Sequence, residues 1–315
     1  MTRSIVALLP GQGSQRVGMG KDLAEAFPAA RAVFEAVDDA IEAPLSALMF
    51  DGPADELTRT VNAQPALLAH SAAVWAVVRE ALGPSLQAAA GHSLGEFSAY
   101  HVAGMLDVQN AARLVRRRGA LMYDQGLARP GAMAAVLGIL TTPIDVLCAT
   151  ASEERGLVVP ANYNSQEQVV ISGEVAGVER AMELAKEAGA KRCLPLPVSG
   201  AFHSPLMQAA ATGLDEALAS ASMHTPTVPV FANVNGEPVS SAARARVLLV
   251  EQLTAPVQWV TVMTQLAATY PDALFVEFGT GSVLTGLARR ITPQIATASC
   301  GTVADVEKLM ELVQA

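Results

Sequence analysis

The run Gly91-His-Ser-Leu-Gly95 restricts the fold of this chain more than any other feature of the sequence. It follows a short apolar run at 86–90 and precedes a helix-like segment at 95–103. A G-x-S-x-G run between a strand and a helix forms a nucleophile elbow, where small flanking residues allow a sharp turn that exposes the serine hydroxyl. The alternative is a glycine-rich turn whose serine only caps the helix. Both interpretations predict strand, turn and helix here, and the first makes Ser93 a candidate nucleophile.

Strand-like and helix-like segments alternate along the chain, which is typical of a parallel sheet covered by helices. Hydrophobic residues make up 51% of the 315 residues and aromatic residues only 4%, as expected for buried strands and alanine-rich helices. We therefore predict an α/β protein. The expected strands include 4–9, 86–90 and 274–278, and the expected helices include 21–37, 64–82, 95–103 and 107–123, the last with Asp107 as N-cap.

The middle of the chain has a different pattern. It starts after the breaker Ala128-Arg-Pro-Gly131 and ends at Leu194-Pro-Leu-Pro197. The expected order is strand 131–139, helix 143–154, strands 157–163 and 168–172, helix 175–188 and strand 192–197. This β-α-β-β-α-β order is the ferredoxin-like pattern. We predict a small subdomain at 130–197, inserted into a large α/β subdomain made of 1–129 and 198–315.

Composition excludes several classes of function. A formal net charge of −9 disfavours nucleic acid or an anionic membrane as a partner, because both require a basic surface. The three cysteines form no C-x-x-C pair, so neither a zinc site nor a disulfide framework is expected. No segment is expected to reach the length of a membrane span, and the apolar run 5–9 is too short for a signal peptide. We expect a reduced, soluble, cytoplasmic protein.

A serine nucleophile needs a base, and the chain has five histidines. His203 has the best position, because it follows an expected strand and precedes a helix that Pro205 can start. His70 lies in an apolar helical stretch and suits the core, and His92 should point away from Ser93. The other two histidines are His101 and His224, and neither has a special context.

Arg118 falls on the apolar face of the helix expected at 107–123, between Leu114 and Leu121. A guanidinium that points inward needs an anion, because an unpaired buried charge is costly. The anion is either an internal Asp or Glu, or a substrate carboxylate held by two hydrogen bonds.

The loop Pro10-Gly-Gln-Gly-Ser-Gln15 follows the first expected strand. It is not a phosphate-binding loop, because Met19 stands where that motif requires lysine, and it does not spell G-x-G-x-x-G. Its backbone N–H groups could instead contribute to an oxyanion hole.

Several stretches together resemble the malonyl-CoA:acyl-carrier-protein transacylases of type II fatty acid synthesis and the related acyltransferase domains of polyketide synthases. They occur in order over nearly the whole chain. They are LPGQGSQ (9–15), QPAL (64–67), GHSLGE (91–96), RG (118–119), NYNSQEQVVISG (162–173), LPLPVSGAFHSPLM (194–207), PVQW (256–259) and GTGSVLTGL (279–287). The resemblance implies an α/β-hydrolase-like large subdomain with an inserted ferredoxin-like one, in agreement with the pattern above.

The resemblance also implies roles for individual residues. Ser93 is the nucleophile and His203 its general base and acid, and a backbone carbonyl orients the histidine instead of an acidic side chain. The remaining implied roles are the histidine-orienting carbonyl for Gln252, oxyanion-hole N–H groups for Gln12 and Leu94, the substrate carboxylate for Arg118, and the pocket wall for Gln64, Asn162 and Phe202. Phe202 would narrow the pocket against a branched acyl group.

The implied reaction is a ping-pong transfer of malonyl from malonyl-CoA to the phosphopantetheine thiol of an acyl carrier protein, with no cofactor. Three alternatives stay open. They are a trans-acting acyltransferase of a polyketide synthase, a serine esterase or thioesterase with the same elbow, and a silent subunit that binds an acyl carrier.

Overall fold

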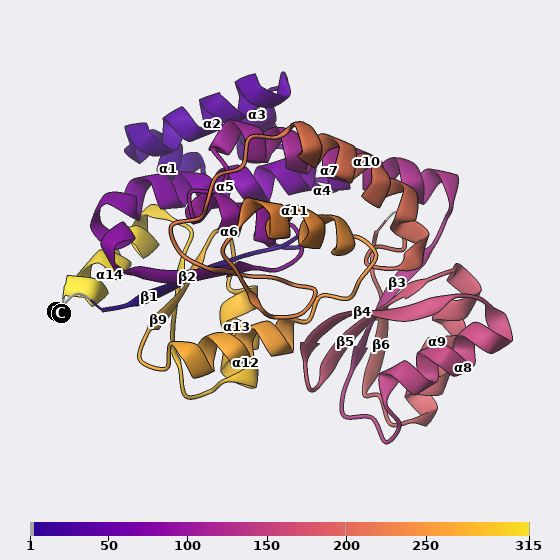
Figure 1. Ribbon diagram of the computed structural model, residues 1–315. Helices are drawn as coiled ribbons and strands as arrows, with labels where there is room; N and C mark the ends of the chain where they lie inside the picture. Colours follow the sequence, from indigo (N-terminus) through magenta and orange to yellow (C-terminus); the bar gives the residue numbers. More distant parts are fainter. Residues whose placement is uncertain (1–2, 199, 315) are drawn as a thin grey trace.

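The computed structural model describes residues 3–198 and 200–314, so Ser199 of the run 194–207 and the ends of the expected large subdomain lie outside the described residues. Two sheets organise the chain (Figure 1). The larger sheet has the strand order β10-β9-β1-β2-β7-β8. Its strands are β1 (Ile5–Leu9), β2 (Leu86–Gly91), β7 (Val230–Phe231), β8 (Pro238–Val239), β9 (Leu274–Phe278) and β10 (Ala296–Cys300). All neighbouring strands pair in parallel except β7 and β8.

Strand β1 is buried on both faces, which explains why its five residues are all apolar. Because successive side chains point to opposite faces, Ile5, Ala7 and Leu9 enter one core while Val6 and Leu8 enter another. Helices α12 (Trp259–Thr269) and α13 (Val283–Ile291) cover the second face. The other helices of this part are α1 (Lys21–Ala26), α2 (Pro28–Ile41), α3 (Leu45–Asp51), α4 (Ala54–Thr58), α5 (Thr60–Leu82), α6 (Gly95–Val102), α7 (Val108–Ala128), α10 (Gln208–Ser220), α11 (Ala242–Glu251) and α14 (Val303–Gln314), with the 3-10 turns η1 (Gly83–Ser85) and η2 (Pro205–Met207).

The smaller sheet has the order β4-β5-β3-β6, and every neighbouring pair in it is antiparallel. Its elements are β3 (Ala132–Leu137), α8 (Ile144–Arg155), β4 (Val158–Ser165), β5 (Gln168–Gly173), α9 (Val175–Glu187) and β6 (Arg192–Pro195). All six elements expected for 131–197 are therefore confirmed, each within two residues at either end. Helices α8 and α9 pack on one face of this sheet around a separate core (Figure 1).

Three of the expected helices differ from the structure by more than two residues. Helix α7 runs to Ala128, five residues beyond the end expected at 123, and proline explains the other two differences. The segment 21–37 forms two helices, because Phe27 before Pro28 adopts an extended backbone that ends α1. Helix α5 begins at Thr60 and contains Pro65, although proline lacks the N–H that would bond to the carbonyl of Val61. That carbonyl instead accepts a hydrogen bond of 2.9 Å from Arg116 Nη1.

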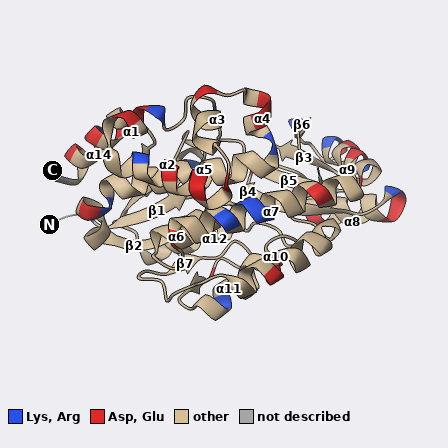
Figure 2. Cartoon of the chain, turned by 90° about the horizontal axis from the view of Figure 1, so that it is seen from above, with Lys and Arg blue, Asp and Glu red and all other residues tan. Residues whose placement is uncertain are grey.

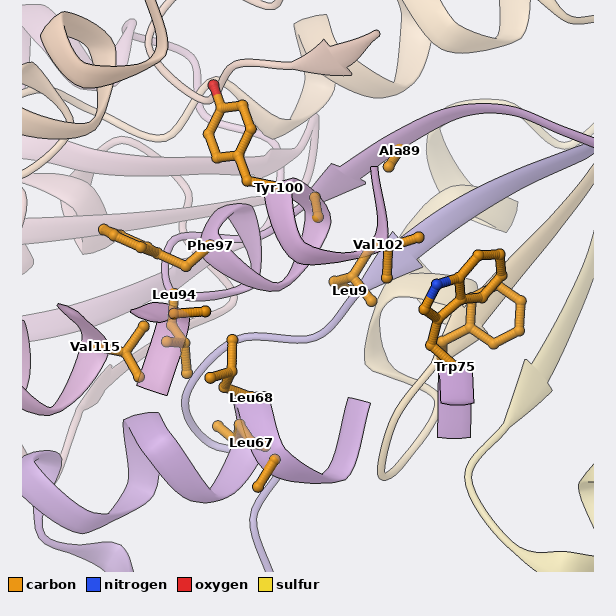
Figure 3. Packing of buried hydrophobic residues seen from close by; sticks show 14 of the residues in the cluster. Leu9, Leu67, Leu68, Trp75, Ala89, Leu94, Phe97, Tyr100, Val102 and Val115 are labelled. Carbon is orange, nitrogen blue, oxygen red and sulfur yellow. The ribbon is translucent and has the colours of Figure 1, made fainter. Parts of the chain in front are cut away.

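Helix α5 also corrects the expectation that no segment reaches the length of a membrane span. The segment Thr60–Ser85 is long and apolar enough by length and composition, yet 78% of its most apolar window is buried inside the protein. Figure 3 shows its residues Leu67 and Leu68 near Leu94 and Val115, and its residue Trp75 near Leu9 and Val102. The helix is apolar all round because it is a core element.

Charged residues lie mostly at the periphery of the molecule. Figure 2 shows them on the outer helices α1, α8, α9 and α14, while basic residues also interrupt α7 near the centre. Helix α7 begins as expected, since the side chain of Asp107 accepts a hydrogen bond of 2.7 Å from the backbone N–H of Asn110. This cap fixes the start of the helix that carries Arg118.

Candidate active site

Ser93 lies in a sharp turn between β2 and α6, as the elbow motif predicts. Its backbone φ is 51°, in the left-handed region that few side-chain-bearing residues adopt. The flanking glycines are required by space: a Cβ at Gly91 would lie 1.9 Å from the carbonyl oxygen of Gly95, and a Cβ at Gly95 would lie 2.1 Å from that of Leu9. The motif therefore combines a strained serine with two positions that only glycine can fill.

His203 reaches Ser93 from the segment before η2. Its Nε2 lies 2.8 Å from Ser93 Oγ, and its Nδ1 lies 2.8 Å from the backbone carbonyl oxygen of Gln252. Because a carbonyl only accepts hydrogen bonds, Nδ1 carries the proton and Nε2 is free to accept one from the serine. Burial, reinforced by the charge of Arg118, lowers the pKa of His203 to about 3. The imidazole is therefore neutral near pH 7, the state that a general base needs.

Arg118 lies beside the same hydroxyl and is only 1% exposed. Its Nη1 donates to Gln64 Oε1 at 2.8 Å, and its Nη2 donates to Ser93 Oγ at 3.0 Å and to Gln252 Oε1 at 2.9 Å. Its Nε has no hydrogen-bond partner among the described residues. No ion pair within the described ranges includes Arg118, so the internal salt bridge left open by the sequence is not formed.

A buried cation with only neutral partners can still accept an anion. Burial lowers the pKa of Arg118 to about 10, so the guanidinium stays charged near pH 7. A guanidinium has five N–H donors, and the hydrogen bonds above use three of them. The remaining donors suit a carboxylate brought in by a substrate.

Gln12 and Leu94 both line the cavity next to Ser93. Within residues 3–198 and 200–314, neither backbone N–H donates to a protein acceptor. Leu94 also immediately precedes α6, where backbone N–H groups are left without intrahelical partners. Two N–H groups in these positions are available to an oxyanion formed at the Ser93 hydroxyl.

The comparisons with known proteins agree with this geometry. A family model described as an acyl transferase domain matches residues 6–308. The chain belongs to the acyl transferase domain family. It is 44% identical to the malonyl CoA-acyl carrier protein transacylase of Bacillus subtilis strain 168 over 310 residues, which are 98% of this chain and 96% of that protein. It is 41% identical to the protein of the same name from Escherichia coli K12 over 305 residues, or 97% of this chain and 98% of that one.

Solved structures of similar proteins cover this acyl transferase almost completely. The acyl-carrier-protein-S-malonyltransferase of Bartonella henselae superposes with a TM-score of 0.94 at 43% identity, covering 99% of this chain and 100% of that one. A malonyl-transacylase in complex with a type II polyketide acyl-carrier protein has a TM-score of 0.93 at 40% identity, covering 98% and 99% of the two chains.

The cavity of this acyl transferase has a volume of ≈ 230 Å³ and lies between the two sheets. Ser93, His203 and Arg118 line it from the part of the chain that holds the larger sheet. Met133 and Asn162 line it from strands β3 and β4 of the smaller sheet. The structure thus brings together eight of the nine residues expected at the site as lining residues: Gln12, Gln64, Ser93, Leu94, Arg118, Asn162, Phe202 and His203. The ninth, Gln252, lies behind them and contacts His203 through its carbonyl.

Asn233 is a residue of the site that the sequence reasoning missed. It follows β7 and is fully buried. Its Oδ1 accepts a hydrogen bond of 2.6 Å from the backbone N–H of Ser93, and its Nδ2 donates to the carbonyl of Gly91 at 2.7 Å. The available signal was an amide side chain two residues after the end of a strand, at the edge of the parallel sheet where site residues gather.

His92 turns away from Ser93, as predicted, and connects the two sheets. Its Nε2 lies 2.7 Å from Oδ1 of Asn164 on β4, and its ring lies 5.4 Å from that of Trp259. This contact was also missed, because Asn164 is 72 residues away in the chain. This hydrogen bond therefore links the turn that carries Ser93 to the smaller sheet on the other side of the cavity.

His70 provides a prediction about stability. It lies in the core on α5 and is 1% exposed, and burial lowers its pKa to about 4. Because the unfolded chain binds this proton below about pH 6.5, stability should fall as the pH drops from 6.5 toward 4. Between pH 7 and pH 5, protonation of His70 in the unfolded chain should lower the unfolding free energy of the parent by about 2 kcal/mol. We expect His70→Gln to lack this decrease, as measured by urea denaturation at the two pH values. His224→Gln, at an exposed position, is the control and should behave like the parent. An equal dependence of the unfolding free energy on pH in the parent and in His70→Gln would contradict the role given to His70.

Proposed function

We propose that this acyl transferase moves the malonyl group of malonyl-CoA to the phosphopantetheine thiol of an acyl carrier protein through a malonyl ester on Ser93. The observation that carries the proposal is the buried guanidinium of Arg118. Its Nη2 lies 3.0 Å from Ser93 Oγ, and its Nε has no hydrogen-bond partner among the described residues. An acyl group that ends in a carboxylate would satisfy these donors while its thioester carbon lies at Ser93 Oγ. The names of the relatives, which specify malonyl CoA and acyl carrier protein, support the same substrates.

In the first half of the reaction, His203 Nε2 takes the proton of Ser93 Oγ as the oxygen attacks the thioester carbon. The carbonyl of Gln252 accepts from Nδ1–H and stabilises the imidazolium that forms. The tetrahedral oxyanion accepts hydrogen bonds from the N–H groups of Gln12 and Leu94. The carbon–sulfur bond then breaks, and the CoA sulfur leaves with the proton from Nε2.

In the second half, the thiol of the carrier protein gives its proton to His203 and attacks the malonyl ester. The oxyanion forms at the same N–H groups, the bond to Ser93 Oγ breaks, and His203 returns the proton to the serine. Each proton and each acyl group is thus transferred by side chains of this chain, so we expect no cofactor. We also expect a cytoplasmic location, where malonyl-CoA and carrier proteins of type II systems meet.

We also propose that the two sheets belong to two subdomains. The order β4-β5-β3-β6 with α8 and α9 on one face supports a ferredoxin-like subdomain at 130–197. The elbow after β2 in a mainly parallel sheet supports an α/β-hydrolase-like subdomain for 1–129 and 198–315. The cavity between them then has a wall from each subdomain, including Asn162 and Phe202.

The second candidate function is hydrolysis by the same elbow, in which water attacks the acyl-serine. A serine esterase or thioesterase has no use for a buried cation beside its nucleophile, which is why Arg118 favours transfer of a carboxylate-bearing group. The supply of malonyl to fatty acid synthesis is the first expectation for the carrier, and a polyketide carrier is the alternative, which the polyketide carrier complex of one relative supports.

The deciding experiment mixes the protein with malonyl-CoA alone and follows its intact mass together with the release of free CoA. We expect a stable gain of one malonyl group, which is discharged when holo-acyl carrier protein is added. Steady release of CoA without an adduct would identify a hydrolase. Absence of both signals would favour the silent carrier-binding subunit. The rates at which fatty acid and polyketide carrier proteins accept the malonyl group would show which of the two pathways the enzyme supplies.

A further inference from the structure

A buried carboxylate lies directly behind the nucleophile and has no part in the reaction described above. Glu96 is the second residue of α6 and is 0% exposed. Its Oε2 accepts hydrogen bonds from Gln252 Nε2 at 2.7 Å and from the backbone N–H of Asn233 at 3.1 Å. Its Oε1 accepts one from the hydroxyl of Tyr100 at 3.4 Å. A fully buried carboxylate is rare unless a positive charge compensates it.

The compensating charge is Arg118, which reaches Glu96 through a single carboxamide. Arg118 Nη2 donates to Gln252 Oε1, and Gln252 Nε2 donates to Glu96. Gln252 is itself fully buried, so the two charges interact through a region from which water is excluded. Glu96 therefore stabilises the cation through its charge and accepts no hydrogen bond directly from Arg118.

A malonyl carboxylate on Arg118 would place a second negative charge close to Glu96. Two anions near one cation repel each other, and a proton on Glu96 relieves the repulsion. Burial raises the pKa of Glu96 to about 7, so this proton is available near neutral pH. The charged or titratable groups around it are Tyr100 on the same helix and Arg118 on α7, with Arg244 on α11 near Tyr100.

We propose that Glu96, when it is ionised, is the counter-charge of Arg118 in the empty enzyme, and that a bound malonyl carboxylate takes over this role while Glu96 takes up a proton from solvent. The inference rests on the malonyl transfer proposed above. Glu96 is then a positioning and tuning residue that makes malonyl recognition depend on pH. By thermodynamic reciprocity, protonation of Glu96 must strengthen malonyl binding as much as malonyl binding favours protonation.

The sign of the effect follows from these charges. Below about pH 7 Glu96 is neutral and malonyl binding is strongest, and above it the carboxylate weakens binding. We expect the second-order rate constant of Ser93 acylation by malonyl-CoA, divided by that for acetyl-CoA, to fall about tenfold from pH 6 to pH 8.5, a coupling of ordinary size. Acetyl-CoA lacks the carboxylate, so the ratio cancels every pH effect on His203 and on the chemistry of acylation.

The experiment measures acylation by rapid quench and intact mass, with longer times for acetyl-CoA. Glu96→Gln keeps the shape of the side chain and removes its charge, so its ratio should be independent of pH and close to the low-pH value of the parent. Tyr100→Phe removes a donor to the carboxylate, so the fall in the ratio should move to higher pH. Glu277→Gln is the matched control, since Glu277 is equally buried but accepts hydrogen bonds from Leu284 and Thr285 of α13.

A flat ratio in the parent enzyme would overturn the proposal whatever the variants do, and so would an unchanged slope in Glu96→Gln. If Glu96→Gln does not fold, the parent profile and the shift in Tyr100→Phe carry the test. A failure of the proposed function has a different signature, because then no malonyl adduct forms in the parent at any pH.

Discussion

Replacement of Ser93 by alanine is expected to abolish the malonyl adduct and to lower the rate of malonyl transfer by about 10⁴- to 10⁶-fold. The hydroxyl oxygen is the atom to which the acyl group becomes bound, and it lies 2.8 Å from His203 Nε2 and 3.0 Å from Arg118 Nη2. Residual transfer would come from binding and the oxyanion hole alone. Intact mass after incubation with malonyl-CoA, together with the steady-state rate, measures the effect.

Ser98→Ala is the matched control for this prediction. Ser98 lies on α6, the helix that follows the turn at Ser93. It is 2% exposed, and its hydroxyl has no hydrogen-bond partner among the described residues. We expect it to keep the adduct and the rate of the parent enzyme. An adduct that persists in Ser93→Ala would move the nucleophile to another residue, and tryptic mapping of the malonyl group would locate it.

Replacement of Arg118 by alanine is expected to lower kcat/KM for malonyl-CoA by about 30- to 5,000-fold and to change acetyl transfer far less. The range corresponds to the loss of one partner of a buried, hydrogen-bonded charge pair, about 2–5 kcal/mol. Arg118→Lys keeps the charge but not the planar fork, so it should recover only part of the activity. The rate of acylation by each acyl-CoA is the measurement.

Arg113→Ala, an exposed position on the same helix, serves as the control and should leave both rates unchanged. Because Arg118→Ala also leaves the side-chain oxygens of Gln64 and Gln252 without their donor, its thermal unfolding should be recorded alongside. Equal losses for malonyl and acetyl would mean that Arg118 supports the shape of the site and does not recognise the carboxylate.

Local sequence patterns predicted the local structure well, because they depend on interactions between near neighbours. The glycines of the elbow, the cap at Asp107 and the six elements of the smaller sheet follow from turn chemistry and hydrophobic period alone. The same patterns placed Arg118 on the inward face of α7, which the structure confirms. They failed where proline acted in an unexpected way, at the break before Pro28 and inside α5 at Pro65, and they ended α7 five residues before Ala128.

The residues that meet Ser93 and Arg118 at the site come from distant segments of the chain, so no local sequence pattern predicts them. His203 stood out only by its place after a strand, and Gln252 was implied by a family resemblance and by nothing in its neighbours. Whether the anion for Arg118 is internal could not be decided from the helix that carries it, since Glu96 and Gln252 lie on other segments. Asn233 was missed for the same reason.

By itself, the sequence determined the α/β class, the strand–turn–helix that exposes Ser93, and an arginine turned toward the interior. The tertiary structure alone decided what these groups meet: a histidine 110 residues away, an asparagine 140 residues away and a glutamine 159 residues away along the chain. The physical reason is the range of the forces involved. Backbone geometry and side-chain periodicity act over a few residues, whereas hydrogen bonds and charge compensation act between any groups that the packed sheets bring within about 3 Å.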